Sequence, residues 1–181
     1  MKRIFIIHGW NSNPGSGWRA WLSDQLKEKF LVYAPEMPDS LNPQMNRWIQ
    51  KISENVQTPD ENCFFVGHSL GCTAILRYLE SINTRIGGCV LVAGPSNDMG
   101  FPFIKSFFET KFEWAKIKRN CEKFIIIHSS NDKTVPIDHA YVFKDNLSAE
   151  LVIDHKGHFS GTEGIHKADS IIKAVNKITE S

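Results

Sequence analysis

The feature of this sequence that most restricts its fold is a short segment in which an apolar run, a tight glycine turn and a helical pattern follow one another. Residues 64–66 are apolar, and residues 67–71 read G-H-S-L-G, which fits the pattern G-x-S-x-G. This order predicts a strand, a sharp turn with Ser69 at its tip, and a helix whose N-terminal amide groups face the serine. We interpret Ser69 as a candidate nucleophile; the alternative is an ordinary glycine-rich turn.

Strand and helix patterns alternate along the whole chain. Apolar, β-branched runs predict strands over residues 3–7, 30–34, 63–66, 88–93, 123–128 and 150–154. Apolar residues at helical spacing predict helices over residues 18–29, 43–56, 70–82, 138–146 and 165–179. Such alternation predicts an α/β fold, a parallel sheet covered by helices on both faces, in a single domain over residues 1–181.

Composition excludes several classes of protein. The chain has 181 residues, 41% hydrophobic and 23% charged, which is typical of a globular domain, and its formal net charge is +1. A balanced charge of this kind does not predict a nucleic-acid or anionic lipid partner. The apolar run at the N-terminus is too short for a signal peptide or a membrane span. The four cysteines form no C-x-x-C pair, which favours reduced thiols over a disulfide, so we expect a cytoplasmic protein.

The segment between the predicted fourth and fifth strands, residues 95–120, breaks the alternation because it is rich in aromatic side chains. One interpretation is that these rings pack into the core. The other is that they form an apolar rim beside Ser69, since loops at the carboxyl ends of strands line the ligand crevice in such folds. The candidate substrate-pocket residues are Trp10, Met99, Phe101, Phe103 and Phe107.

A serine nucleophile needs a base within hydrogen-bond reach and a third group that orients the base. Of the seven histidines, His158 is favoured because it lies in a glycine-flanked loop after the last strand; His155 is the alternative. Asp132 follows the fifth strand and is favoured as the acid, although aspartate is also common in loop turns. Asp98, after the fourth strand, is the alternative acid.

An oxyanion hole would need two backbone N–H groups near the serine. The residue after the nucleophile, Leu70, is one expected donor, and Trp10, in the loop after the first strand, is the other. The sequence has no H-E-x-x-H, Walker or G-x-G-x-x-G motif, so we expect neither a metal nor a nucleotide cofactor.

Taken together, these motifs resemble the α/β-hydrolase superfamily, and more narrowly the small serine hydrolases grouped with retinoblastoma-binding protein nine. The similarity runs nearly end to end, from the His8-Gly9-Trp10 turn through Ser69 and the loop of Asp132 to His158. It implies Ser69, Asp132 and His158 as the catalytic triad. It also implies a three-layer α/β/α sandwich with a minimal lid and a six-stranded parallel sheet in the order 2-1-3-4-5-6.

The resulting hypothesis is a cofactor-free, carboxylesterase-like serine hydrolase acting on small carboxylic esters, or on amides or thioesters, through an acyl-enzyme. Its partner would be a small-molecule ester or acyl substrate. The alternative is a catalytically silent protein of the same fold that binds a partner protein or a small ligand. Transfer of the acyl group to an acceptor other than water would use the same three residues.

Overall fold

The computed structural model describes residues 1–180 and is built on one parallel sheet. Its strands are β1 (Arg3–Ile7), β2 (Leu31–Tyr33), β3 (Cys63–His68), β4 (Gly88–Val92), β5 (Phe124–Ser129) and β6 (Glu150–Asp154). They pair in the order β2-β1-β3-β4-β5-β6, and every neighbouring pair is parallel. The predicted strand order and the predicted parallel pairing are therefore confirmed.

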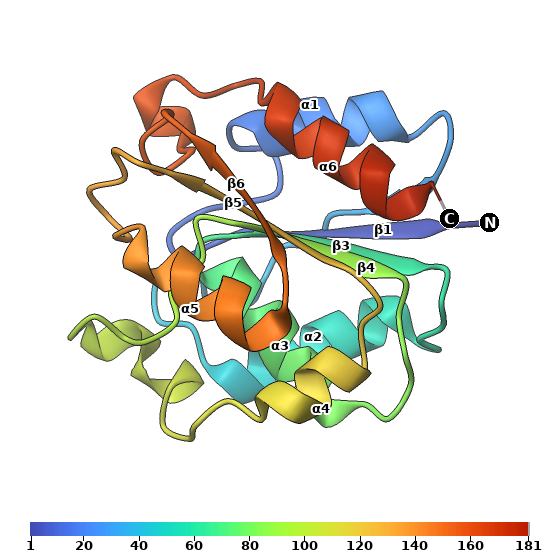
Figure 1. Ribbon diagram of the computed structural model, residues 1–181, viewed down its shortest axis with the longest axis horizontal. Coiled ribbons are helices and arrows are strands. Elements are labelled where there is room, and N and C mark those ends of the chain that lie inside the picture. Colours follow the sequence, from blue (N-terminus) through green and yellow to red (C-terminus); the bar gives the residue numbers. More distant parts are fainter. Residues whose placement is uncertain (181) are drawn as a thin grey trace.

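Helices cover both faces of the sheet, so the molecule has three layers (Figure 1). One face carries α1 (Trp18–Leu26) and α6 (Asp169–Thr179). The other face carries α2 (Met45–Val56), α3 (Leu70–Ser81), α4 (Trp114–Arg119) and α5 (Asp138–Leu147). Two short 3-10 helices, η1 (Pro102–Phe107) and η2 (Gly161–Glu163), lie in loops.

Each face of the sheet has its own hydrophobic core, and the strands supply both. Ile4 and Ile6 of β1 pack into the core beneath α1 and α6, whereas Phe5 and Ile7 pack into the core beneath α2 and α3. This division follows from the alternation of side chains along a strand. It also explains why the inner strands β1, β3, β4 and β5 read as nearly uninterrupted apolar runs, because both of their faces are buried. The edge strands β2 and β6 are partly exposed.

Element boundaries differ from the predicted ones mainly at helix ends. The last helix begins at Asp169 and not at residue 165. Before α6 the chain forms η2, whose N-terminus is stabilised by a capping box between Ser160 and Glu163. The chain then turns at Gly164, which has a φ of 77°. His166 therefore lies in a loop and not in the predicted helix.

The aromatic segment between β4 and β5 divides its rings between the core and the surface. Phe107 is fully buried and packs edge-on against Trp48 of α2, with ring centroids 5.6 Å apart. The prediction that Phe107 lines a substrate pocket is therefore wrong, because its backbone carbonyl is fixed by the buried Arg77 and its ring fills the core. Phe101, in contrast, is 40% exposed.

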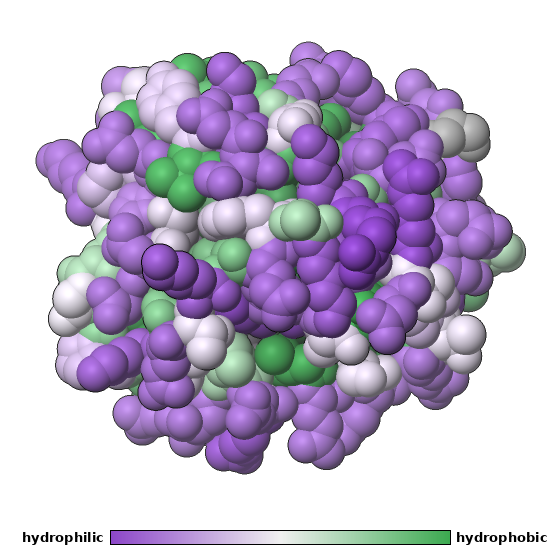
Figure 2. Space-filling model, turned by 60° about the horizontal axis from the view of Figure 1, so that its bottom comes forward, coloured by the Kyte–Doolittle hydropathy of each residue, from purple (hydrophilic) through white to green (hydrophobic). Residues whose placement is uncertain are grey.

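Hydrophilic residues predominate on the face of the molecule that Figure 2 shows, and apolar residues form only small separate areas there. No helix within residues 1–180 is both long and apolar enough to cross a membrane.

Candidate active site

The candidate site lies at the carboxyl edge of the sheet, where the loops that follow β1, β3, β5 and β6 meet. Parallel strands end at the same edge, so residues far apart in the sequence are brought together there. Ser69 directly follows β3, Asp132 lies in the loop after β5, and His158 lies in the loop after β6. The loop after β1 adds Trp10.

The turn that carries Ser69 is strained and tightly packed, as the sequence predicted. Ser69 has a φ of 53° and a ψ of −125°, a conformation that residues with a side chain rarely adopt. Neither Gly9, in the loop after β1, nor Gly71, in the first turn of α3, could be replaced by a larger residue without a clash. A Cβ atom on Gly9 would lie 2.8 Å from the Cβ of Ser69, and one on Gly71 would lie 2.3 Å from the carbonyl oxygen of Ile7.

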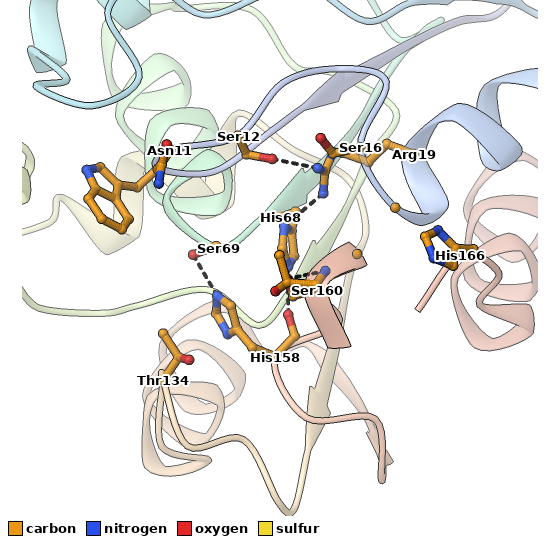
Figure 3. Close-up of a pocket in the computed structure, with 14 residues that line it drawn as sticks. Asn11, Ser12, Ser16, Arg19, His68, Ser69, Thr134, His158, Ser160 and His166 are labelled. Carbon is orange, nitrogen blue, oxygen red and sulfur yellow. Dashed lines mark hydrogen bonds between the residues drawn. The ribbon is translucent and has the colours of Figure 1, made fainter. Parts of the chain in front are cut away.

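Ser69, His158 and Asp132 form a continuous series of hydrogen bonds. The Oγ of Ser69 lies 3.0 Å from the Nε2 of His158, a contact visible in Figure 3. The Nδ1 of His158 lies 2.8 Å from the Oδ2 of Asp132. The other carboxylate oxygen of Asp132 accepts hydrogen bonds from the backbone amides of Thr134 and Val135, at 2.8 and 2.9 Å. This arrangement can take a proton from a serine hydroxyl and stabilise the resulting imidazolium.

Asp132 is suited to remain ionised although its side chain is fully buried. Burial acts to raise the pKa of its carboxyl group, but the hydrogen bond and charge of His158, together with the two backbone amides, act in the opposite direction. The net effect is a pKa below the usual value of an aspartate. At neutral pH an ionised carboxylate therefore faces the Nδ1 of His158.

A second histidine, His128, lies behind Asp132 but is held in a neutral form. Its Nε2 donates to the carbonyl of Val135 at 2.9 Å, and is 3.7 Å from the Oδ2 of Asp132. Burial lowers the pKa of His128, and its Nδ1 has no hydrogen-bond partner in the described part of the chain. His128 therefore does not compete with His158 for the acid.

The loops that carry the acid and the base are joined directly to each other. The side-chain oxygen of Asn131 accepts from the amide of Gly157 at 2.9 Å, and the Oγ of Ser129 accepts from the amide of Lys156 at 3.0 Å. These bonds fix the separation of Asp132 from His158 through the main chain, in addition to the contact between their side chains.

The alternative acid and base are not brought into this arrangement. The Nδ1 of His155 lies 3.1 Å from the Oγ of the exposed Ser130. The Oδ1 of Asp98 accepts from the backbone amide of Gly100 at 3.0 Å, as in an ordinary loop turn.

A cavity of about 490 Å³ opens beside Ser69 and His158. Of the predicted pocket residues, only Trp10 lines it. Phe103 stacks on Trp10 with centroids 4.5 Å apart, and Phe101 stacks on Phe103 at 5.3 Å, so the three rings form one stacked series beside the cavity. Met99 and Phe103 both pack against the core beneath α2 and α3.

Several residues that line the cavity were missed by the sequence analysis. They are polar side chains from the loop after β1, the start of α1 and the loop around η2: Ser12, Ser16, Arg19, Ser160, Thr162 and His166. Their spacing in the sequence carries no motif that could have identified them. Within residues 1–180, no group of three or more His, Cys, Asp or Glu side chains is placed to hold a metal ion.

Comparison with known proteins gives matches over nearly the whole chain. YdeN of Bacillus subtilis (strain 168) is 32% identical over 168 residues, which cover 90% of this chain and 88% of YdeN. The serine hydrolase RBBP9 of Rattus norvegicus is 28% identical over 164 residues, which cover 88% of this chain and 86% of RBBP9. The crystal structure of the ydeN gene product from B. subtilis has a TM-score of 0.95 and 28% identity, with both chains covered completely.

These similarities confirm the α/β-hydrolase fold that the strand order had indicated. The sequence profile of one family, described as serine hydrolase, matches residues 4–177, which include the glycine turn and the loops after β1, β5 and β6. The chain belongs to the serine hydrolase family.

Proposed function

We propose that this serine hydrolase cleaves small carboxylic esters, with Ser69 as nucleophile, His158 as base and Asp132 as the orienting acid. The observation that carries the proposal is the unbroken series of hydrogen bonds, 3.0 Å from Ser69 to His158 and 2.8 Å from His158 to Asp132. Both distances lie in the range from which a base can accept the proton of a nucleophile.

In the first half of the reaction, the Oγ of Ser69 forms a bond to the acyl carbon of the ester while its proton passes to the Nε2 of His158. The electron pair of the carbonyl group moves onto its oxygen. As that pair returns, the bond to the alcohol breaks, and His158 donates its proton to the leaving oxygen. In the second half, water attacks the acyl-enzyme with His158 again as base, and the acid is released with Ser69 restored.

The backbone amides of Leu70 and Trp10 are the proposed donors to the oxyanion. Leu70 is the first residue of α3, so its amide lies at the positive end of the helix. The close approach of Gly9 to Ser69 brings the loop after β1 next to the nucleophile. Both features support a charge-stabilising role, since preorganised N–H groups are the usual means of stabilising such an oxyanion.

An apolar acyl or aryl group suits the aromatic side chains beside the cavity. Trp10 lines the cavity, and outside its lining Phe103 stacks on Trp10 and Phe101 stacks on Phe103. These rings support esters with an apolar acyl chain as the preferred substrates.

The test is covalent labelling by a fluorophosphonate, measured by intact mass. We expect one adduct on the wild type, none on Ser69→Ala and much slower labelling of His158→Ala. Ser130→Ala is the matched control, because Ser130 also contacts a histidine, at 3.1 Å, but is exposed; it should be labelled like the wild type. Failure of the folded wild type to react would contradict the proposal and favour a catalytically silent binding protein. A series of esters with increasing chain length, with amides and competing alcohols, then defines the substrate class.

A further inference from the structure

Two buried side chains that the proposed reaction does not use are linked by hydrogen bonds to the main chain of His158. Arg19 of α1 is 2% exposed and His68 at the end of β3 is 5% exposed. An Nη atom of Arg19 lies 3.0 Å from the Nδ1 of His68, and the Nε2 of His68 lies 2.8 Å from the main-chain carbonyl oxygen of His158. Figure 3 shows this series of contacts running from the start of α1 to the loop after β6.

The chemistry of arginine fixes the direction of both hydrogen bonds. A guanidinium group can only donate, so the Nδ1 of His68 must accept and carries no proton. The proton of neutral His68 is therefore on Nε2, and this N–H donates to the carbonyl of His158. Burial, then the neighbouring His158, then Arg19 keep the pKa of His68 well below its usual value, which agrees with a neutral ring.

Arg19 is an unusual residue to find buried, because the groups that hold it are neutral. It donates to the Oγ of Ser12 at 2.6 Å and to the carbonyl of Asn13 at 3.3 Å, and no carboxylate accepts from it in the described residues. Burial without a counter-charge lowers its pKa to about 10. Such a charge is unfavourable for folding, which points to a role other than stability.

The carbonyl that His68 holds belongs to a loop in which His158 lies between two residues with positive φ, Gly157 and Phe159, both at 54°. The amide of His158 donates to Glu163 at 2.8 Å, and the carbonyl of Phe159 accepts from the indole of Trp18 at 3.0 Å. The amide of Phe159 donates to the carbonyl of Lys156 at 3.1 Å. His68 holds the carbonyl oxygen of that same peptide group, so both peptide groups of His158 are fixed. With this part of the main chain fixed, the imidazole of His158 can move only by rotation about its own side-chain bonds.

We infer that Arg19 and His68 are positioning residues for His158: Arg19 sets the tautomer of His68, and His68 holds the His158 main chain where the imidazole reaches both Ser69 and Asp132. The inference rests on the proposed function, because its consequence is the reactivity of Ser69. A displacement of about 1 Å at a catalytic group is enough to lower a rate about 100-fold.

The test compares the rate of fluorophosphonate labelling in three variants. His68→Phe keeps an aromatic ring but removes both hydrogen bonds, and Arg19→Met removes the donor. We expect both to lower the maximal labelling rate, measured at saturating probe, by about 10-fold to 100-fold. The rate at saturation is compared because both residues also line the cavity, so either substitution can change probe affinity separately. His68→Gln retains an N–H donor for the carbonyl of His158 and should recover most of that rate.

Arg77→Met is the matched control. Arg77 is also buried, at 3% exposed, but it donates to the carbonyl of Phe107 and not to the His158 loop. It should lower the unfolding temperature and leave the labelling rate unchanged. Labelling of folded Arg19→Met and His68→Phe at the wild-type rate would overturn the inference while leaving the proposed function intact. A wild type that does not react at Ser69 would instead overturn the proposed function.

A measurement on the wild type keeps the inference falsifiable if the variants do not fold. Nitrogen-15 chemical shifts distinguish the two tautomers of a histidine ring. We expect a protonated Nε2 and an unprotonated Nδ1 for His68 at neutral pH. The opposite tautomer would contradict the bond from Arg19 and with it the whole inference.

Discussion

Replacement of Gly71 by alanine tests the close packing between the serine turn and the end of β1. The added Cβ would lie 2.3 Å from the carbonyl oxygen of Ile7 and 2.7 Å from that of His8. An ordinary contact is at least 3.4 Å, so the first of these groups must retreat by about 1.1 Å, the difference of the two distances. Ile7 is the last residue of β1 and pairs with Gly67 of β3, directly before the serine turn, so its backbone has little freedom to move.

The expected loss of stability is about 2 kcal/mol. Overpacking against a fixed backbone costs about 3 kcal/mol, and the better helix propensity of alanine offsets about 1 kcal/mol of it, because Gly71 lies in the first turn of α3. For a chain of this length, such a loss corresponds to a decrease in melting temperature of roughly 4–8 °C. The same displacement would separate the loop after β1 from Ser69 and slow its labelling.

Urea unfolding of wild type and Gly71→Ala measures the difference in free energy directly. Gly15→Ala is the control, because a Cβ on Gly15 meets nothing closer than 3.5 Å and the residue does not need a positive φ. A Gly71→Ala protein that is as stable as the wild type and labels at the same rate would refute the packing argument.

Two further predictions concern the buried histidines and the aromatic segment. Burial is the largest cause of a lowered pKa in four histidines: His8, His68, His128 and His139. As the pH falls, the unfolded chain binds protons at these sites near pH 6.5, whereas the folded protein binds them only at a lower pH. The free energy of unfolding should therefore be highest above about pH 6.5 and should decrease as the pH falls through the lower folded pKa values. Equal urea midpoints at about pH 7 and pH 5 would contradict this expectation. Phe107→Ala should cost about 3–5 kcal/mol of stability because it empties a core position, whereas Phe101→Ala should cost less than about 1.5 kcal/mol; similar losses in urea unfolding would contradict the division of the segment into core and surface rings.

Much of the fold was predictable because its signals are local. The inner strands β1, β3, β4 and β5 are short apolar runs with both faces buried, so periodicity and chain order were sufficient to identify them. The partly exposed edge strands β2 and β6 carry a weaker signal of the same kind. The turn at Ser69 was predictable for the same reason, since its glycines, its strand and its helix are adjacent in the sequence. The ends of helices were less predictable, because the loop before α6 is shaped by the capping box of Ser160 and Glu163 and not by apolar spacing.

Contacts between distant residues could not be predicted in this way. Arg19 and His68 are 49 positions apart, and His68 and His158 are 90 apart, so no local pattern records their hydrogen bonds. Arg19 is charged, and by its type alone it belongs on the exposed side of α1. Likewise, Phe101 and Phe107 are the same type of residue in one short segment. Phe107 is buried because it packs against Trp48 of α2, a contact between distant residues that the local sequence does not record.

The backbone conformation of Ser69 has a consequence for laboratory evolution of this protein. A positive φ is unfavourable for serine and neutral for glycine, so a glycine at this position would relieve a local strain of about 1 kcal/mol or more. A library screened only for yield or heat resistance would therefore enrich glycine at position 69 and accumulate well-folded proteins without the proposed nucleophile. Selection for a more robust protein must therefore be coupled to turnover at every round.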